Sequence, residues 1–123
     1  MSEKMSRNEM TKSLPSRPIS LTQAVELLAD NNTLNRILRE GNYRAVGNRI
    51  ATFIAEMQNF RKVDLLDGDD MHEVKQGIQR VVNMPACRGT EKPHLLETIE
   101  ECLRKRQLSL EYVEGIALPE HKE

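Results

Sequence analysis

One stretch of the chain, residues 42–60, constrains the fold more than any other. Its large apolar residues recur at alternating steps of three and four, at Tyr43, Val46, Ile50, Phe53, Met57 and Phe60. This rhythm is the a/d pattern of an amphipathic helix, because residues three and four apart share one face. We call these six residues the seam; Ala51 and Ile54 widen it. The pattern predicts a central helix that could span a small domain.

Length and composition indicate the fold class of the chain. The chain has 123 residues, which suits a single domain, and 38% of them are hydrophobic. Aromatic residues make up only 3%, and Trp is absent, so the core must consist of aliphatic side chains and Met. That supply favours helices packed on helices. We therefore predict an all-α fold, a compact bundle of four to five helices, with one domain over residues 19–118.

The two ends of the chain differ from this domain. Residues 1–18 are polar and mildly basic and show no periodicity, which predicts a disordered arm. Residues 119–123 form a charged tail. No apolar run approaches the ~20 residues of a membrane span, and the N-terminus lacks the apolar region of a secretory signal. We therefore expect no membrane partner. Because the chain has only two cysteines, we also expect it to be cytoplasmic.

Capping signals divide the first half of the domain. Ser20 with Gln23 forms a capping box that predicts a helix from residue 21 to about 30, which two asparagines then end. Thr33 can cap a short second helix over residues 34–40. Gly41 suits the left-handed position after that helix, and Asn42 suits the N-cap of the central one.

The second half is expected to add two more helices and a final turn. Asp70 with Glu73 reads as a capping box before residues 71–82, although the β-branched content leaves open whether this segment is a helix. Gly77 in its middle costs stability unless a neighbour packs closely there. A longer helix is predicted over residues 93–106 and one further turn over residues 110–114.

Candidate catalytic and metal-binding groups are few. Asp64, Asp67, Asp69 and Asp70, near His72 and Glu73, do not have the spacing of a calcium loop and predict a solvated turn. Cys87, beside Arg88, is the better thiolate candidate of the two cysteines, but no base is placed near it by the sequence. An enzyme that uses this thiol is a third hypothesis. We expect a protein that is not an enzyme and has no metal, no other cofactor and no small-molecule substrate.

A local resemblance points to DNA. Residues 21–41, LTQAVELLADNNTLNRILREG, resemble the helix-turn-helix of excisionase-like winged regulators. In that family a Leu-Thr start and an Ala-x-Glu-Leu-Leu helix precede a turn, a second helix reads into Arg-Glu-Gly, and a wing follows. The resemblance implies that the second helix enters the major groove. It places Thr33, Asn35, Arg36 and Arg39 near DNA, with Arg44 and Arg49 on a wing that turns at Gly47-Asn48. Residues 43–53 can therefore be read as helix or as wing hairpin.

Two functions follow from these patterns. The leading hypothesis is a non-enzymatic protein-interaction or regulatory module that acts through the seam, and the style of the sequence favours a prokaryotic or phage system. Because the seam is longer than two short helices can cover, a second copy is expected to share it, which would give a homodimer. The partner is then the chain itself or another protein. The alternative is a small helix-turn-helix DNA-binding regulator. The near-balanced charge, a net −1, disfavours a protein that coats nucleic acid by charge alone.

Overall fold

A computed structural model of the chain describes residues 21–118, and the predicted all-α fold is confirmed for them. They contain five α-helices, two short 3₁₀ helices and no strand. The α-helices are α1 (Leu21–Ala29), α2 (Asn31–Arg39), α3 (Tyr43–Arg61), α4 (Gly68–Val82) and α5 (Lys92–Lys105); the 3₁₀ helices are η2 (Gly89–Glu91) and η3 (Leu110–Val113). The predicted arm over 1–18, the Ser20 cap and the tail over 119–123 lie outside the described residues.

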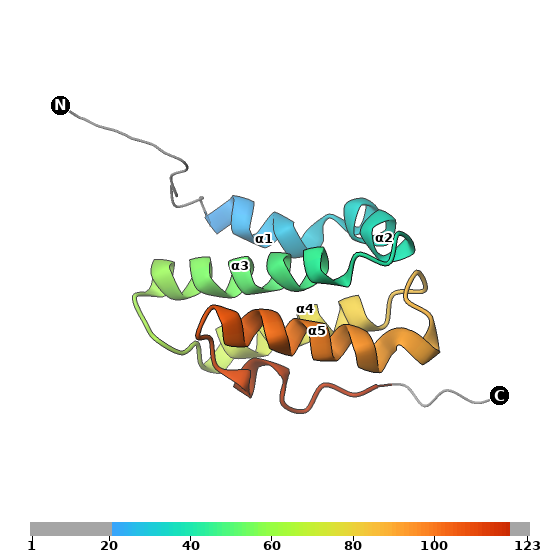
Figure 1. The fold of residues 1–123 in the computed structure, drawn as a ribbon. Coiled ribbons are helices and arrows are strands. Elements are labelled where there is room, and N and C mark those ends of the chain that lie inside the picture. The colour runs from blue at the N-terminus through green and yellow to red at the C-terminus, as the bar shows by residue number, and fades with distance from the viewer. Residues whose placement is uncertain (1–20, 119–123) are drawn as a thin grey trace.

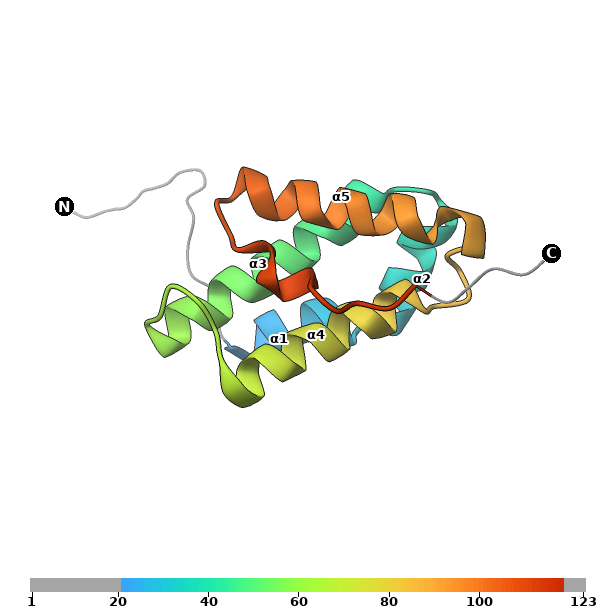
Figure 2. The same cartoon turned by 90° about the horizontal axis from the view of Figure 1, so that it is seen from below.

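The central helix α3 organises the bundle. α1 and α2 lie on one side of it and α5 lies along another, while α4 lies behind α5 (Figure 1). Seen from below, η3 lies across the face that α4 and α5 form (Figure 2). The backbone of α3 closely approaches α1, α2 and α5. α4 stands further off and reaches the core through fully buried side chains, among them Val74, Ile78 and Val81.

Residues 43–53 are helix, so the wing hairpin expected from the resemblance is wrong, and Arg44 and Arg49 lie on α3 instead. The helix begins where the sequence predicts: the Asn42 carboxamide oxygen accepts a hydrogen bond from the Ala45 amide at 3.3 Å. Gly41 has a φ of +74°, as expected for the residue that ends α2. An uninterrupted run of apolar residues at helical spacing outweighs the hairpin potential of Gly47-Asn48.

The seam is the interior of a single chain rather than an open surface. Val46 and Ile50 are completely buried, Phe53 and Met57 are nearly so, and Tyr43 is half-buried. Burying each such side chain contributes about 1.5–3 kcal/mol, so the seam stabilises the monomer fold. Only Phe60, 56% exposed, is left for a partner. α1, α2 and α5 pack on α3 and cover the rest of the seam, so its length does not require a second copy, and the homodimer stays a prediction.

The boundary between α1 and α2 is tighter than the sequence indicates. A single residue, Asp30, separates the helices, and α2 begins at Asn31 rather than at Leu34. Asp30 is the N-cap, because its carboxylate accepts hydrogen bonds from the amide and the hydroxyl of Thr33, at 3.2 and 2.6 Å. These bonds, the hydroxyl one first, lower the pKa of Asp30. The prediction that Thr33 caps α2 is wrong, since Thr33 donates to the cap.

Residues 71–82 are helix, but α4 begins earlier, at Gly68. Asp67 is the N-cap residue, and its side chain makes no capping bond, so the capping box predicted at Asp70 and Glu73 is absent. Asp70 instead forms a two-contact ion pair with Arg61 at the end of α3, at 2.8 and 3.2 Å. This pair ties together the two ends of the loop between α3 and α4.

A buried tyrosine holds the last part of the domain in place. The Tyr112 hydroxyl, carried by η3, accepts a hydrogen bond from the Leu66 amide at 2.9 Å and donates to the carboxamide oxygen of Gln58 on α3. Ser109 caps η3 through its hydroxyl, as the sequence predicts. η3 thereby fills the space between α4 and α5 and connects both to α3.

Candidate protein-interaction groove

A groove of about 540 Å³ opens between α1 and α4. Its apolar surface is formed by Phe53 of α3 and by residues of both flanking helices: Val25, Leu28, Ala29 and Gly77. Its lip is polar and consists of Glu73, Gln76, Gln79, Arg80 and Asn83, all on or just after α4. An apolar bed with a few polar groups at its edge is the usual composition of a binding site.

The groove exists because α4 carries a glycine where it faces α1. A Cβ at Gly77 would lie only 3.1 Å from Cδ1 of Leu28. The sequence leaves open whether a neighbour packs closely at this mid-helix glycine, and in the structure Leu28 of α1 does so. Gly77 is only half-buried, so no side chain closes the space above Phe53.

Two arginines fix the wall that α1 forms. Arg49 of α3 donates to the carbonyl oxygen of Leu27 at 2.9 Å. Arg80 of α4 donates to the carbonyl oxygen of Leu28 and to the side-chain oxygen of Asn31. Carbonyls in the last turn of a helix lack helical partners, so these guanidinium groups act as C-terminal caps of α1. α1, α3 and α4 are thereby held in register around the groove.

The open charge on the lip is negative. Glu73 is exposed and makes no ion pair or hydrogen bond within residues 21–118. The one cation on the lip, Arg80, is already engaged with α1 and Asn31. Glu26, exposed on the outer side of α1, adds a second carboxylate near the groove. A ligand with a basic group beside its apolar surface would match this arrangement.

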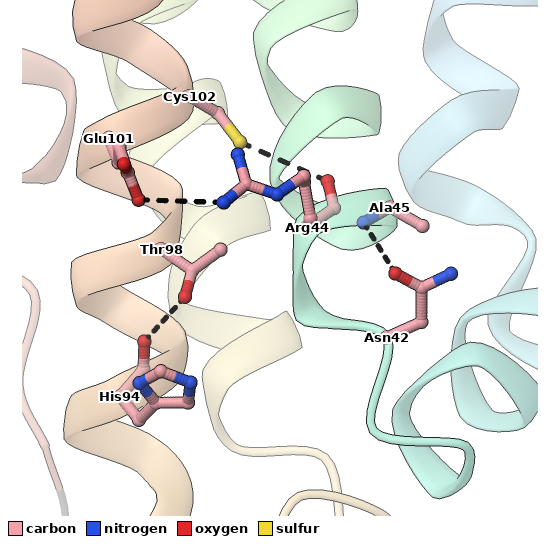
Figure 3. Close-up of polar contacts among 7 residues, drawn as sticks. All are labelled: Asn42, Arg44, Ala45, His94, Thr98, Glu101 and Cys102. Carbon is pink, nitrogen blue, oxygen red and sulfur yellow. Dashed lines mark hydrogen bonds and ion pairs between the residues drawn. The ribbon is translucent and has the colours of Figure 1, made fainter.

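The six residues predicted near DNA do not form one surface. Arg36 and Arg39 are exposed on α2 and make no ion pair within the described residues, whereas Thr33 is occupied by Asp30 and Asn35 is half-buried. Arg49 is committed to α1. Arg44 points across to α5, 3.9 Å from Glu101 (Figure 3). Only the two arginines of α2 are available as the resemblance implies.

The surroundings of Cys87 do not favour a reactive thiol. Cys87 is buried, and burial raises the pKa of its thiol despite the opposing Lys92 ammonium. A raised pKa favours the protonated thiol, the opposite of an activated nucleophile. The Lys92 ammonium donates to the carbonyl oxygens of Val82 and Cys87 and so closes the loop before α5. Within residues 21–118 no cluster of three or more His, Cys, Asp or Glu side chains is placed to hold a metal ion.

None of the helices in the described part of the chain is both long and apolar enough to cross a membrane. Comparisons of the chain with protein-family models, with curated proteins and with solved structures found no match.

The groove is the feature that sequence reasoning misses. Its residues come from three helices, and no local pattern in the sequence brings them together. Two signals do exist in the sequence. Gly77 marks the point where α4 comes close to α1. Arg80 on α4 is a cation that can reach the C-terminal end of α1, which has no basic residue in its own last turn.

Proposed function

We propose that this chain is a non-enzymatic protein-interaction module that receives a short amphipathic helix of a partner protein in the groove between α1 and α4. The observation that carries the proposal is the groove that α1, α3 and α4 line with apolar residues, with the unpaired Glu73 carboxylate on its lip. Helix-in-groove recognition uses such beds, because apolar anchors at i, i+3 or i+4, and i+7 lie along one face of the ligand.

The length and charge of the surface define the partner further. Phe60 is seven residues beyond Phe53, so it lies on nearly the same side of α3, about 10 Å further along. Its ring, 56% exposed with the Arg61 guanidinium 5.3 Å from its centroid, offers a further apolar surface along α3. The carboxylates of Glu73 and Glu26 favour a partner helix that carries Lys or Arg beside its apolar stripe.

A peptide selection tests this proposal. A displayed library of 16-residue helices, with aliphatic or aromatic anchors on one face and all other positions random, is panned against the full chain. We expect enriched helices to carry Lys or Arg next to the anchors. Fluorescence polarisation should then show binding that Glu73→Lys weakens by about tenfold, which corresponds to one lost charge contact near 1.4 kcal/mol.

Glu97→Lys is the matched control, because it makes the same charge change at an exposed position of α5, away from the groove. It should leave affinity within about twofold. Gly77→Leu, which fills the groove, should abolish binding. If the selected helices bind Glu73→Lys and Gly77→Leu as tightly as the wild type, the groove is not the site.

A second candidate function, a helix-turn-helix DNA-binding regulator, is supported by one specific observation. Arg36 and Arg39 lie exposed on α2, directly after the one-residue turn at Asp30, and neither forms an ion pair within residues 21–118. Two exposed guanidinium groups on one face of a helix after a turn are suited to phosphate or base contacts.

The double variant Arg36→Ala with Arg39→Ala tests the DNA hypothesis. It should unfold like the wild type, because both side chains are exposed, but bind DNA more weakly, with a salt slope smaller by about two. Duplex binding is measured by fluorescence polarisation over a series of salt concentrations. Equal affinity and equal slope in the variant and the wild type would remove this candidate.

A further inference from the structure

Residues 115–118, which we call the strap, lie on α4 as an extended peptide lies in a binding site. The strap follows η3 at Gly115, whose φ of +82° turns the chain. Figure 2 shows this segment running on from η3 along the face shared by α4 and α5. Ile116 and Leu118 are half-buried against the core, while Ala117 between them is exposed. Alternation with a period of two is the pattern of an extended chain that packs one face on a surface.

A single side chain holds the backbone of the strap. The carboxamide of Gln79 on α4 donates to the carbonyl oxygen of Ala117 at 2.7 Å and accepts from the amide of the same residue at 2.8 Å. Both hydrogen bonds involve the main chain of Ala117 and not its side chain, as they do when a protein binds an extended peptide through main-chain hydrogen bonds. Specificity then rests on the two aliphatic side chains that flank Ala117.

The strap is held by few contacts compared with the core. Its two aliphatic side chains are only half-buried, and both bonds from Gln79 are exposed to solvent. Segments with few buried contacts and exposed hydrogen bonds open locally at a small fraction of the global free energy. When the strap opens, Gln79 is left with a free donor and acceptor beside the part of the core against which Ile116 and Leu118 pack.

We propose that this surface of α4 is a second binding site, for an extended segment of a partner protein with an aliphatic–small–aliphatic triplet, and that the strap is its intramolecular occupant. The strap itself shows what fits: an aliphatic residue, a small residue whose amide and carbonyl both face Gln79, and a second aliphatic residue. A partner segment with this pattern makes the same contacts and competes with the strap. This site meets the groove at Gln79, which also lies on the lip of the groove, but Ile116 and Leu118 pack against the core outside the groove. The peptide of residues 114–118 therefore tests the strap site without a partner helix.

A peptide titration of the full chain tests the proposal. The probe is a blocked synthetic peptide with the sequence of residues 114–118, Glu-Gly-Ile-Ala-Leu, and binding is read from the NMR signals of the Gln79 side-chain amide. Ile116→Asp with Leu118→Asp releases the strap while leaving Gln79 in place. This double variant should bind the peptide about tenfold or more tightly than the wild type, where the strap competes. Adding Gln79→Ala should abolish binding, because both backbone hydrogen bonds are lost.

A control peptide with Pro at the position of Ala117 lacks the amide that donates to Gln79 and should bind at least about fivefold more weakly. Equal binding of the two peptides, or no binding to a folded strap-released variant, would overturn the proposal. If the strap-released variant does not fold, hydrogen exchange of the wild type tests whether the strap opens locally. The Ala117 amide should exchange by local opening, at a rate that low denaturant does not change. Exchange only through global unfolding would also overturn it.

Discussion

At the scale of single residues, a few side chains determine how closely the helices approach. Gly47 is buried where α3 meets α5, and a Cβ there would lie 2.6 Å from Sγ of Cys102. The thiol in turn lies 3.9 Å from the carbonyl oxygen of Arg44 on α3 (Figure 3). Cys102 therefore acts as a small core residue that fits against a glycine.

Gly47→Ala should destabilise the fold. Overpacking of about 1–3 kcal/mol exceeds the gain of up to about 1 kcal/mol from replacing a helical glycine. In a Cys102→Ala background the added methyl group has room, so the same substitution should cost less or stabilise. Urea unfolding of the four chains measures this coupling. Equal effects of Gly47→Ala in both backgrounds would show that the two residues do not oppose each other.

The two buried thiols also predict how stability depends on pH. Burial raises the pKa of Cys87 and Cys102, whereas unfolded cysteines titrate near pH 8.5. Above about pH 8.5 the unfolded chain therefore binds fewer protons than the folded chain, so the free energy of unfolding falls as pH rises. Below that pH these groups contribute no pH dependence.

Urea unfolding at pH 7.5 and at pH 9.5 checks this expectation. The free energy of unfolding should fall more between pH 7.5 and pH 9.5 in the wild type than in the variant Cys87→Ala with Cys102→Ala. Only this pH-dependent change is compared, because the variant can be less stable at both pH values. A loss of the same size in the two proteins would mean that the thiols do not contribute.

At the scale of elements, the sequence predicts which helices exist better than it predicts where they begin. The seam identifies α3 because six large residues repeat at helical spacing, and Asn42 marks its start. The beginnings of α2 and α4 are misplaced by three residues each. Thr33 and Asp70 are sound capping residue types, but Asp30 and Asp67 occupy the N-cap positions. The choice between neighbouring caps depends on the path of the preceding chain, which no local pattern encodes.

The groove and the strap depend on contacts between elements, which explains why the sequence shows neither. Arg80 illustrates this: the sequence shows only a cation on the surface of α4, yet its guanidinium bonds Leu28 at the end of α1 and Asn31 at the start of α2, 52 and 49 residues away along the chain. Likewise Gln79 meets Ala117 only because η3 brings the chain back across α4. Such pairings follow from topology rather than from periodicity.

Arg80→Ala should release the C-terminal end of α1. The variant loses hydrogen bonds to a helix-terminal carbonyl and to Asn31, which together contribute about 1–3 kcal/mol. Hydrogen exchange should accelerate in α1 more than in α5. Arg39→Ala, which removes an exposed arginine without a partner in the described residues, should change stability by less than about 0.5 kcal/mol. If both variants unfold alike, Arg80 is not a cap.

At the scale of the whole molecule, the seam completes a one-chain core, and the surfaces left for partners lie elsewhere. Phe60, Val63 and Leu65 are the large apolar side chains that stay exposed within residues 21–118, and they lie at the end of α3 and in the loop after it. The groove between α1 and α4 has its floor on the same helix, at Phe53.

The most direct test of this account is an NMR map of a selected amphipathic helix bound to the uniformly labelled chain. The groove proposal predicts that backbone shifts change along residues 25–29 of α1 and from residue 73 of α4 to Asn83 just after it, with a further change at Phe60, while α5 stays unperturbed. Shifts centred on Arg36 and Arg39 of α2, or spread along the outer face of α5, would contradict it.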